Sequence, residues 1–222
     1  MTQRSILIVA PHPDDETLGC GGTMACRARQ GCRITVVVVT DGRHLFRLSR
    51  WKIEAAPTPA EASAMRKDET RRAVAILAGE AAAIRFLDVE DATLAHHVDA
   101  VAETLASIVR EVRPDEIYVT SQHEEHPDHV AACVAVRSAM RSTRSRATLY
   151  RYVIALAGGR SPDTVGEPTV AVDIGPQQDL KRRAVSQFAS HLTIVGRGQT
   201  EPFFASIEPW VRPVEVFFVD AP

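Results

Sequence analysis

The chain has 222 residues, of which 45% are hydrophobic and 24% are charged, as in an ordinary globular domain. This length can bury a sizeable core without disulfides, so we expect one domain over residues 1–222. The formal net charge of -2 argues against nucleic acid as the main partner, because phosphate binding requires a strongly basic face. The sequence shows no secretory signal, no C-x-x-C pair and no apolar run of the roughly 18 residues that span a membrane. We therefore expect a cytoplasmic protein with reduced cysteines and no membrane partner.

Strand and helix patterns alternate along the chain, which predicts an α/β fold with a mainly parallel sheet covered by helices. The first strand is expected over residues 5–10, a continuous apolar run typical of a strand buried on both faces. Further strands are expected at 33–40, 84–87, 116–120, 149–154, 169–174 and 214–219, the last as an edge or mixed strand. Helices are expected at 17–30, 60–77, 98–112, 127–141 and 177–190, and residues 43–59 form a long segment without periodicity.

Residues 11–16, with the sequence Pro-His-Pro-Asp-Asp-Glu, place one imidazole and three carboxylates directly after the first strand. Open α/β sheets bind ligands at the carboxyl ends of their strands. Adjacent acids repel one another unless a cation compensates them, and a histidine among carboxylates suits a divalent metal, zinc first. Alternatively, Asp14, Asp15 and Glu16 cap the following helix and complement its dipole. This segment alone favours neither interpretation.

A second cluster, residues 123–129, also follows a predicted strand and precedes a predicted helix. Because the carboxyl ends of parallel strands meet at one edge of a sheet, we expect the two clusters to lie together. A catalytic zinc usually has three protein ligands and an open position for water. We expect His12, Asp15 and His129 to be those ligands.

The remaining polar residues of the two clusters indicate hydrolysis of an amide or ester. Asp14, free of the metal, is the expected general base that takes a proton from the attacking water. His126 is expected to stabilise the oxyanion and to protonate the leaving amine. Asp128 is expected to hold the second ring nitrogen of His126 or His129. The sequence contains no G-x-S-x-G nucleophile motif, and its glycines at 19, 21 and 22 follow an acidic cluster that would repel a pyrophosphate.

The combination of residues 11–16, Thr40-Asp41-Gly42 and His126-Pro127-Asp128-His129 resembles the LmbE-like, or PIG-L, zinc-dependent N-deacetylases. The resemblance extends over roughly residues 4–190 through Arg66-x-x-Glu69, Phe86-Leu87 with Asp91, and Lys181-x-x-Ala184. It implies a Rossmann-like three-layer sandwich that removes the acetyl group from an N-acetylglucosamine-type conjugate, with zinc-activated water attacking the amide carbonyl. It implies the same three zinc ligands and the same general base, with His126 as the acid or oxyanion histidine.

The resemblance also implies substrate contacts at Arg66, Asp91 and Asp41. Each of these residues has a structural alternative. Arg66 could form a surface ion pair with Glu69, Asp91 could cap a helix, and Asp41 could belong to an ordinary Asp-Gly turn.

Two departures from the family bear on the substrate. Glu125 stands where the family commonly has glycine, with Glu124 before it, and an extra acid there could repel an anionic substrate or contact an amine. Residues 43–59, which we expect to set the acceptor side of the pocket, align with no subfamily. The expected partner is a small amino-sugar substrate, and the sequence leaves open a homo-oligomer and a divalent metal other than zinc. The alternatives are a non-sugar amide or thiol conjugate as substrate, a catalytically idle sugar-binding module, and a nucleotide-dependent transferase.

Overall fold

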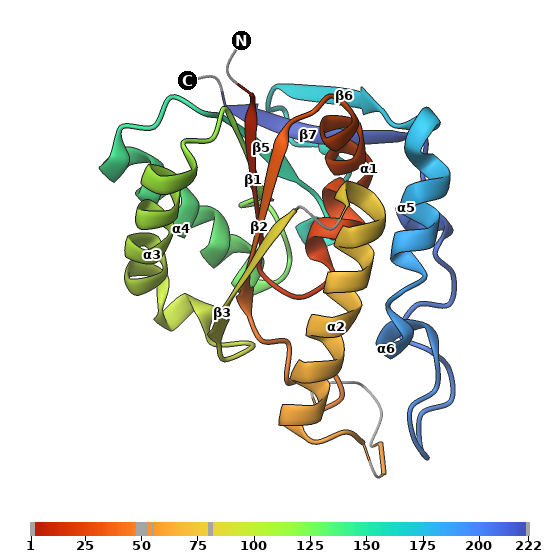
Figure 1. Ribbon diagram of the computed structural model, residues 1–222. Helices are drawn as coiled ribbons and strands as arrows, with labels where there is room; N and C mark the ends of the chain where they lie inside the picture. Colours follow the sequence, from red (N-terminus) through yellow and green to blue (C-terminus); the bar gives the residue numbers. More distant parts are fainter. Residues whose placement is uncertain (1–2, 48–52, 55, 80–81, 221–222) are drawn as a thin grey trace.

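The computed structural model describes residues 3–47, 53–54, 56–79 and 82–220. These residues form a mixed sheet in the order β3-β2-β1-β4-β5-β7-β6 (Figure 1). The strands are β1 Ser5–Ala10, β2 Arg33–Thr40, β3 Ala83–Val89, β4 Glu116–Thr120, β5 Thr148–Tyr152, β6 Thr169–Asp173 and β7 Val214–Asp220. Neighbours from β3 to β5 pair in parallel, whereas β7 runs antiparallel to both β5 and β6. The predicted α/β fold with a mainly parallel sheet is confirmed, and the last strand is a mixed inner strand with β6 at the edge.

Helices cover both faces of the sheet and complete a three-layer sandwich (Figure 1). One layer holds α3 Val98–Val112 and α4 Pro127–Thr143, and the other holds α1 Asp15–Arg29, α2 Pro59–Ala78 and α5 Gln178–Val185. The shorter helices are α6 Ala189–Leu192, η1 Leu94–His96, η2 Ala157–Gly159, η3 Pro162–Thr164, η4 Gly175–Gln177 and η5 Glu208–Trp210. Among the described residues, no helix combines the length and the apolar character that crossing a membrane requires.

The apolar run of β1 is continuous because each face of this strand contacts a different core. Leu7 and Val9 pack in the core formed with α3 and α4, whereas Ile6 and Ile8 pack in the core formed with α1, α2 and α5. Successive side chains of a strand point to opposite faces, so a central strand covered on both sides needs apolar residues at every position. All four side chains are almost fully buried.

The helix predicted over 177–190 is interrupted in the structure. Helix α5 ends at Val185, and α6 begins at Ala189. Phe188, between them, has φ of -83° and ψ of 68°, and its ring is fully buried in the core. Burial of this ring therefore takes precedence over a continuous helix, and it leaves Ser190 and His191 on a separate short helix.

The strand order reverses between β1 and β4, which are parallel neighbours with Ile6 opposite Glu116 and Ile8 opposite Tyr118. The chain leaves β1 toward β2 on one side and leaves β4 toward β5 on the other. Such a switch point opens a crevice at the carboxyl ends of the strands, where α/β proteins bind ligands. Both polar clusters begin at this crevice.

Candidate active site

The turn after β1 directs His12 and Asp15 toward the same point. The backbone N–H of His12 donates to Oδ2 of Asp15 (2.9 Å), and the N–H of Asp15 donates to the carbonyl of His12 (3.3 Å). Asp14, between them, has φ of 141°, which is unfavourable for any residue except glycine and is typical of functional sites. Its side chain makes no capping hydrogen bond to α1, so the helix-cap alternative is wrong for this residue.

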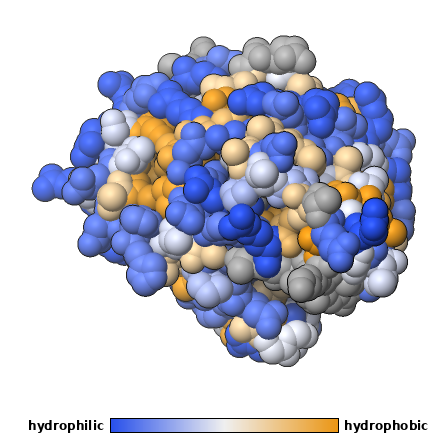
Figure 2. Space-filling view, turned by 90° about the horizontal axis from the view of Figure 1, so that it is seen from below, coloured by the Kyte–Doolittle hydropathy of each residue, from blue (hydrophilic) through white to orange (hydrophobic). Residues whose placement is uncertain are grey.

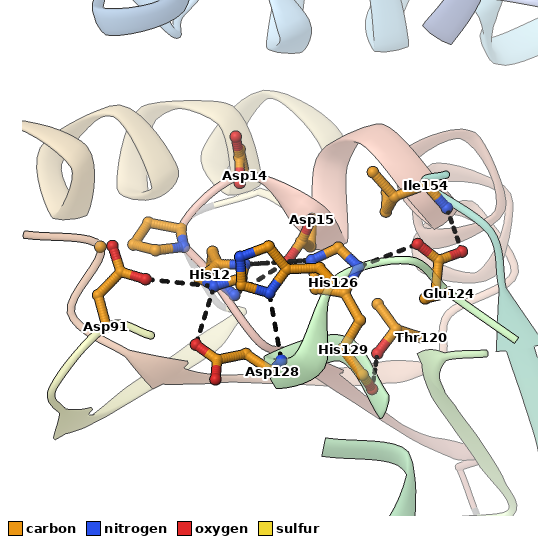
Figure 3. Close-up of polar contacts among 12 residues, drawn as sticks. His12, Asp14, Asp15, Asp91, Thr120, Glu124, His126, Asp128, His129 and Ile154 are labelled. Atoms are coloured by element: carbon orange, nitrogen blue, oxygen red, sulfur yellow. Dashed lines mark hydrogen bonds and ion pairs between the residues drawn. The ribbon is translucent and has the colours of Figure 1, made fainter. Parts of the chain in front are cut away.

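Three atoms of the predicted metal ligands converge at the crevice (Figure 3). Nδ1 of His12 lies 3.1 Å from Oδ2 of Asp15 and 3.1 Å from Nε2 of His129, and the latter two atoms are 3.3 Å apart. Ligand atoms of a tetrahedral zinc with bonds of about 2.0–2.1 Å lie about 3.3 Å from one another. The three buried side chains therefore match one face of such a tetrahedron, and their nitrogen and oxygen donors suit zinc.

Carboxylates hold the second nitrogen of each of these histidines. Nε2 of His12 lies 3.3 Å from Oδ2 of Asp128 and 3.4 Å from Oδ1 of Asp91. Nδ1 of His129 lies 3.0 Å from Oε2 of Glu124. An N–H directed at each carboxylate leaves Nδ1 of His12 and Nε2 of His129 as lone-pair donors, which is the usual arrangement behind metal-bound histidines.

Glu124, named in the sequence analysis only as part of an extra acidic pair beside the substrate, has a role behind a ligand that was not predicted. Besides His129, its carboxylate accepts the backbone N–H groups of Ile154 (2.9 Å) and Ala155 (2.8 Å), beyond the end of β5. Its side chain is buried, so it supports a ligand from behind and does not face a substrate. A single acid in a loop has no periodicity that would reveal such a role.

The predicted partner of Asp128 is wrong. Its carboxylate contacts His12 and accepts the N–H groups of Ala92 (2.8 Å) and Leu94 (3.1 Å), whereas only its backbone N–H contacts His126. Asp128 precedes His129 by one helical position, so the two side chains diverge by about 100° around α4. The aspartate therefore reaches across the crevice to the first cluster.

Asp14 lies beside the three converging atoms and contacts none of them. Oδ1 of Asp14 accepts a hydrogen bond from Nη2 of Arg66 (3.1 Å), and Oδ2 lies 3.3 Å from Nε2 of His191. Burial raises the pKa of Asp14 to about 7, although the positive charge of Arg66 opposes the shift. This value suits a general base that must accept and release a proton near neutral pH.

Arg66 is buried against the turn that carries Asp14. Its guanidinium donates to the carbonyls of Pro13 (2.9 Å) and Gly42 (3.2 Å) as well as to Asp14. Gly42 has φ of 62°, and a Cβ there would lie 2.4 Å from Nη1 of Arg66, so the Asp-Gly turn requires glycine. The alternative of a surface ion pair with Glu69 is wrong, because Glu69 accepts the N–H and hydroxyl of Ser190 instead.

His126 stands at the exposed mouth of the site, and one of its ring nitrogens lies within 4.8 Å of ring nitrogens of His12 and His129. Nδ1 of His126 accepts the backbone N–H of Asp128 (3.2 Å), so a neutral ring carries its proton on Nε2. Burial and the two neighbouring imidazoles lower the pKa of His126. The ring is therefore a neutral hydrogen-bond donor at physiological pH.

A cavity of about 500 Å³ opens over these residues. Arg66 and Asp91, two of the predicted substrate contacts, line it together with His44 and Leu45 from the segment 43–59. Residues 48–52 and 55 of that segment lie outside the described residues. Most of the remaining wall is apolar and comes from Leu18, Ile154, Phe203, Phe204 and Trp210, with His191 among them. Figure 2 looks onto this edge of the molecule, where apolar and hydrophilic surfaces lie next to one another.

Asp41, the third predicted substrate contact, lies outside this cavity. Its carboxylate accepts the backbone N–H groups of Arg43 (3.1 Å) and Asp91 (3.3 Å) and pairs with the Arg43 side chain. It lines a neighbouring cavity with Arg43 and Thr58. Asp41 thus belongs to an Asp-Gly turn that positions Asp91, which is the alternative to a substrate contact.

Sequence reasoning also missed His191, Phe203, Phe204 and Trp210, which line the cavity. All four lie beyond residue 190, where the recognisable motifs end. Phe203 and Phe204 lie outside any helix or strand, so no periodic pattern marks them. Their role depends on how the chain after α5 folds back over the crevice.

Comparison with known proteins places the chain in a family. The profile of the family described as PIG-L, GlcNAc-PI de-N-acetylase, matches residues 7–140. A Bacillus cereus protein named probable N-acetyl-alpha-D-glucosaminyl L-malate deacetylase 2 is 30% identical over 190 residues, covering 85% of this chain and 84% of that protein.

Two solved structures share the fold. The N,N'-diacetylchitobiose deacetylase from Pyrococcus horikoshii superposes with a TM-score of 0.72 and 24% identity, covering 98% of this chain and 84% of that one. The 4-carboxy-2-hydroxymuconate hydratase from Pseudomonas putida superposes with a TM-score of 0.64 and 23% identity, covering 84% and 79%. Because the fold carries more than one reaction, the site must decide the chemistry. The matched family profile and the Bacillus cereus relative establish that this chain belongs to the PIG-L family of N-deacetylases.

Proposed function

We propose that this protein hydrolyses the N-acetyl group of an N-acetylglucosamine-type conjugate, using one zinc ion held by His12, Asp15 and His129. The observation that carries the proposal is the convergence of three ligand atoms at 3.1–3.3 Å beside an aspartate that is not among them. A binding module would have no use for that buried aspartate. Membership of the PIG-L family and the deacetylase named in Bacillus cereus support the reaction.

A divalent metal at this position supplies two effects, polarisation of the amide carbonyl and a lower pKa for a water molecule. The residues of the chain supply the remaining steps. Asp14 takes the proton of the attacking water, while Arg66 keeps the carboxylate pointed into the cavity. The proton on Asp14 is then available to the leaving nitrogen.

His126 serves the other side of the reaction. Its Nε2–H is a hydrogen-bond donor aimed from the mouth of the site, where it stabilises the negative charge that develops on the carbonyl oxygen. A neutral imidazole is a weak acid, so the lowered pKa of His126 favours the oxyanion role over protonation of the amine. Asp128 contributes through His12, whose ring it orients.

The lining of the cavity contains both polar and apolar residues, which suits a sugar substrate. Its polar wall carries Asp91 and His44, which suit hydroxyl groups. Phe204 and Trp210, in the same lining, offer aromatic faces, which pack against the apolar face of a pyranose or an apolar substituent. The guanidinium of Arg66 already donates to Asp14, Pro13 and Gly42, so this residue acts on the base rather than on the sugar.

The test combines metal analysis with a substrate panel. We expect one zinc ion per chain, and hydrolysis of N-acetylglucosaminyl L-malate or diacetylchitobiose in preference to acetylated amino acids and thiol conjugates. Asp14→Asn should keep the zinc and lower kcat by about 10²- to 10⁴-fold. Asp99→Asn, at an exposed position on α3, is the matched control and should keep full activity. Loss of zinc without loss of activity, or a fully active Asp14→Asn, would overturn the proposal.

A further inference from the structure

Helix α2 contacts both oxygens of Asp14, one directly and one through a relay. Arg66 and Glu69 are three positions apart and both are buried, as expected for residues on one face of a helix. Arg66 donates to Oδ1 of Asp14 (3.1 Å). Glu69 approaches Oδ2 through Ser190 and His191: hydrogen bonds join Glu69 to Ser190 and Ser190 to His191, and Nε2 of His191 then lies 3.3 Å from Oδ2.

The directions of these hydrogen bonds follow from the number of protons available. Oε1 of Glu69 accepts the backbone N–H of Ser190 (2.8 Å), and Oε2 accepts its hydroxyl (2.6 Å). A serine hydroxyl has one proton, so Oγ of Ser190 can only accept from Nδ1 of His191, 3.0 Å away. Nδ1 therefore carries the proton of a neutral His191, and Nε2 is a bare acceptor 3.3 Å from Oδ2 of Asp14.

The ring of His191 is held in this orientation. It stacks on Phe204 with 4.7 Å between ring centroids and an interplanar angle of 28°. The backbone N–H of Phe204 donates to the carbonyl of His191 (2.9 Å). Burial, reinforced by the charge of Arg66, lowers the pKa of His191 well below its usual range, so the ring is neutral at physiological pH.

We infer that His191 is a positioning residue for the general base, preset by Glu69 and Ser190 as an acceptor for the proton that Asp14 takes from water. This inference rests on the proposed function. When the O–H bond of the attacking water breaks, its electron pair goes to the amide carbon and its proton goes to Asp14. The new Oδ2–H of Asp14 then donates to Nε2 of His191, which stabilises the protonated aspartate until the proton passes to the leaving nitrogen.

Nitrogen NMR of the zinc-loaded protein measures the protonation of His191 directly, independent of any substrate. The resonances are assigned by their loss in His191→Gln. We expect the wild-type protein to have the proton on Nδ1 and a bare Nε2. A wild-type ring with the proton on Nε2, or with both nitrogens protonated, would overturn the inference even if the enzyme deacetylates sugars.

The substitution Glu69→Gln reverses the direction of the hydrogen bonds between residue 69, Ser190 and His191, and it keeps the size of the side chain. The amide oxygen of glutamine accepts the Ser190 N–H, and its NH₂ group donates to the hydroxyl. The hydroxyl then donates to Nδ1 of His191 and moves the ring proton to Nε2. We expect this tautomer in the NMR spectrum, with kcat about tenfold lower and KM unchanged.

Asp68→Asn is the matched control, because this neighbouring acid on α2 is exposed and pairs with Arg71. It should leave the tautomer and the kinetics as in the wild type. An unchanged tautomer or an unchanged kcat in Glu69→Gln would contradict the inference. If the wild type hydrolyses no amide, the proposed function fails, and the NMR result still decides how His191 is oriented.

Discussion

Glu124 accepts a hydrogen bond from Nδ1 of His129 at 3.0 Å, and this contact fixes which nitrogen of His129 faces the proposed metal. The same carboxylate accepts two backbone N–H groups beyond β5. The Glu124 carboxylate thereby adds to the backbone hydrogen bonds that join the loop before α4 to the chain beyond β5. The orientation of one ligand therefore depends on a residue outside the His-Pro-Asp-His motif.

We expect Glu124→Gln to weaken zinc binding by about 10- to 100-fold, because an amide is a poorer acceptor for the imidazole N–H. Competition with a chelator of known affinity measures the change. Glu125→Gln alters the adjacent acid, which is exposed, and should bind zinc as the wild type does. Equal affinities for the two variants would show that Glu124 does not support the ligand.

Arg66→Met should lower both stability and turnover. The substitution removes the guanidinium that pairs with Asp14 and leaves a buried acid beside two carbonyls that have lost their donor. Breaking a buried ion pair costs on the order of 3–5 kcal/mol, part of which Asp14 recovers by taking up a proton. Urea unfolding measures this loss, and Arg71→Met, on the exposed face of α2, is the control. A stable and active Arg66→Met would contradict the role of Arg66 as the support of the base.

A buried ion pair between Lys181 and Glu215 joins helix α5 to strand β7. The ammonium group of Lys181 donates to the carbonyl of Leu18 and pairs with buried Glu215, which also accepts the N–H groups of Gly22 and Thr23. Lys181→Met leaves Glu215 as an unpaired buried charge and should destabilise the protein by about 3 kcal/mol. Thermal unfolding checks this, with Arg182→Met as the control, because Arg182 is a partly exposed residue of the same helix that pairs with exposed Glu208. Equal melting temperatures would mean that this ion pair is dispensable.

Trp210→Ala tests the apolar wall of the cavity. The indole is half-buried and lines the cavity without contacting the proposed metal ligands. Loss of about 1.4 kcal/mol of apolar contact would raise KM about tenfold and leave kcat nearly unchanged. Steady-state kinetics with the best substrate of the panel provide the measurement. Ile194→Ala, at an exposed position away from this lining, serves as the control. A lower kcat with an unchanged KM would place Trp210 in the chemical step instead.

The fold and the two polar clusters were predictable because they follow local patterns. The apolar runs of β1 and β4 predict two parallel strands, and each polar cluster follows the carboxyl end of one of them. Because parallel strands end at the same edge of a sheet, His12 and His129 were expected to lie together. The partner of Asp128 was not predictable, because it depends on how far α4 rotates between two consecutive residues. The role of Glu124 was not predicted and His191 was missed for a related reason. Their contacts join segments that are far apart in the sequence, and no periodicity in either segment records them.

The most direct test of the account is a crystal structure of the zinc-loaded protein with anomalous diffraction at the zinc edge. We predict a single peak bonded to Nδ1 of His12, Oδ2 of Asp15 and Nε2 of His129, with Asp14 unbound. A second group of closely spaced donors exists on the other side of the same ring, formed by Nε2 of His12 with Asp91 and Asp128. A peak in that group, or coordination by Asp14, would contradict the account.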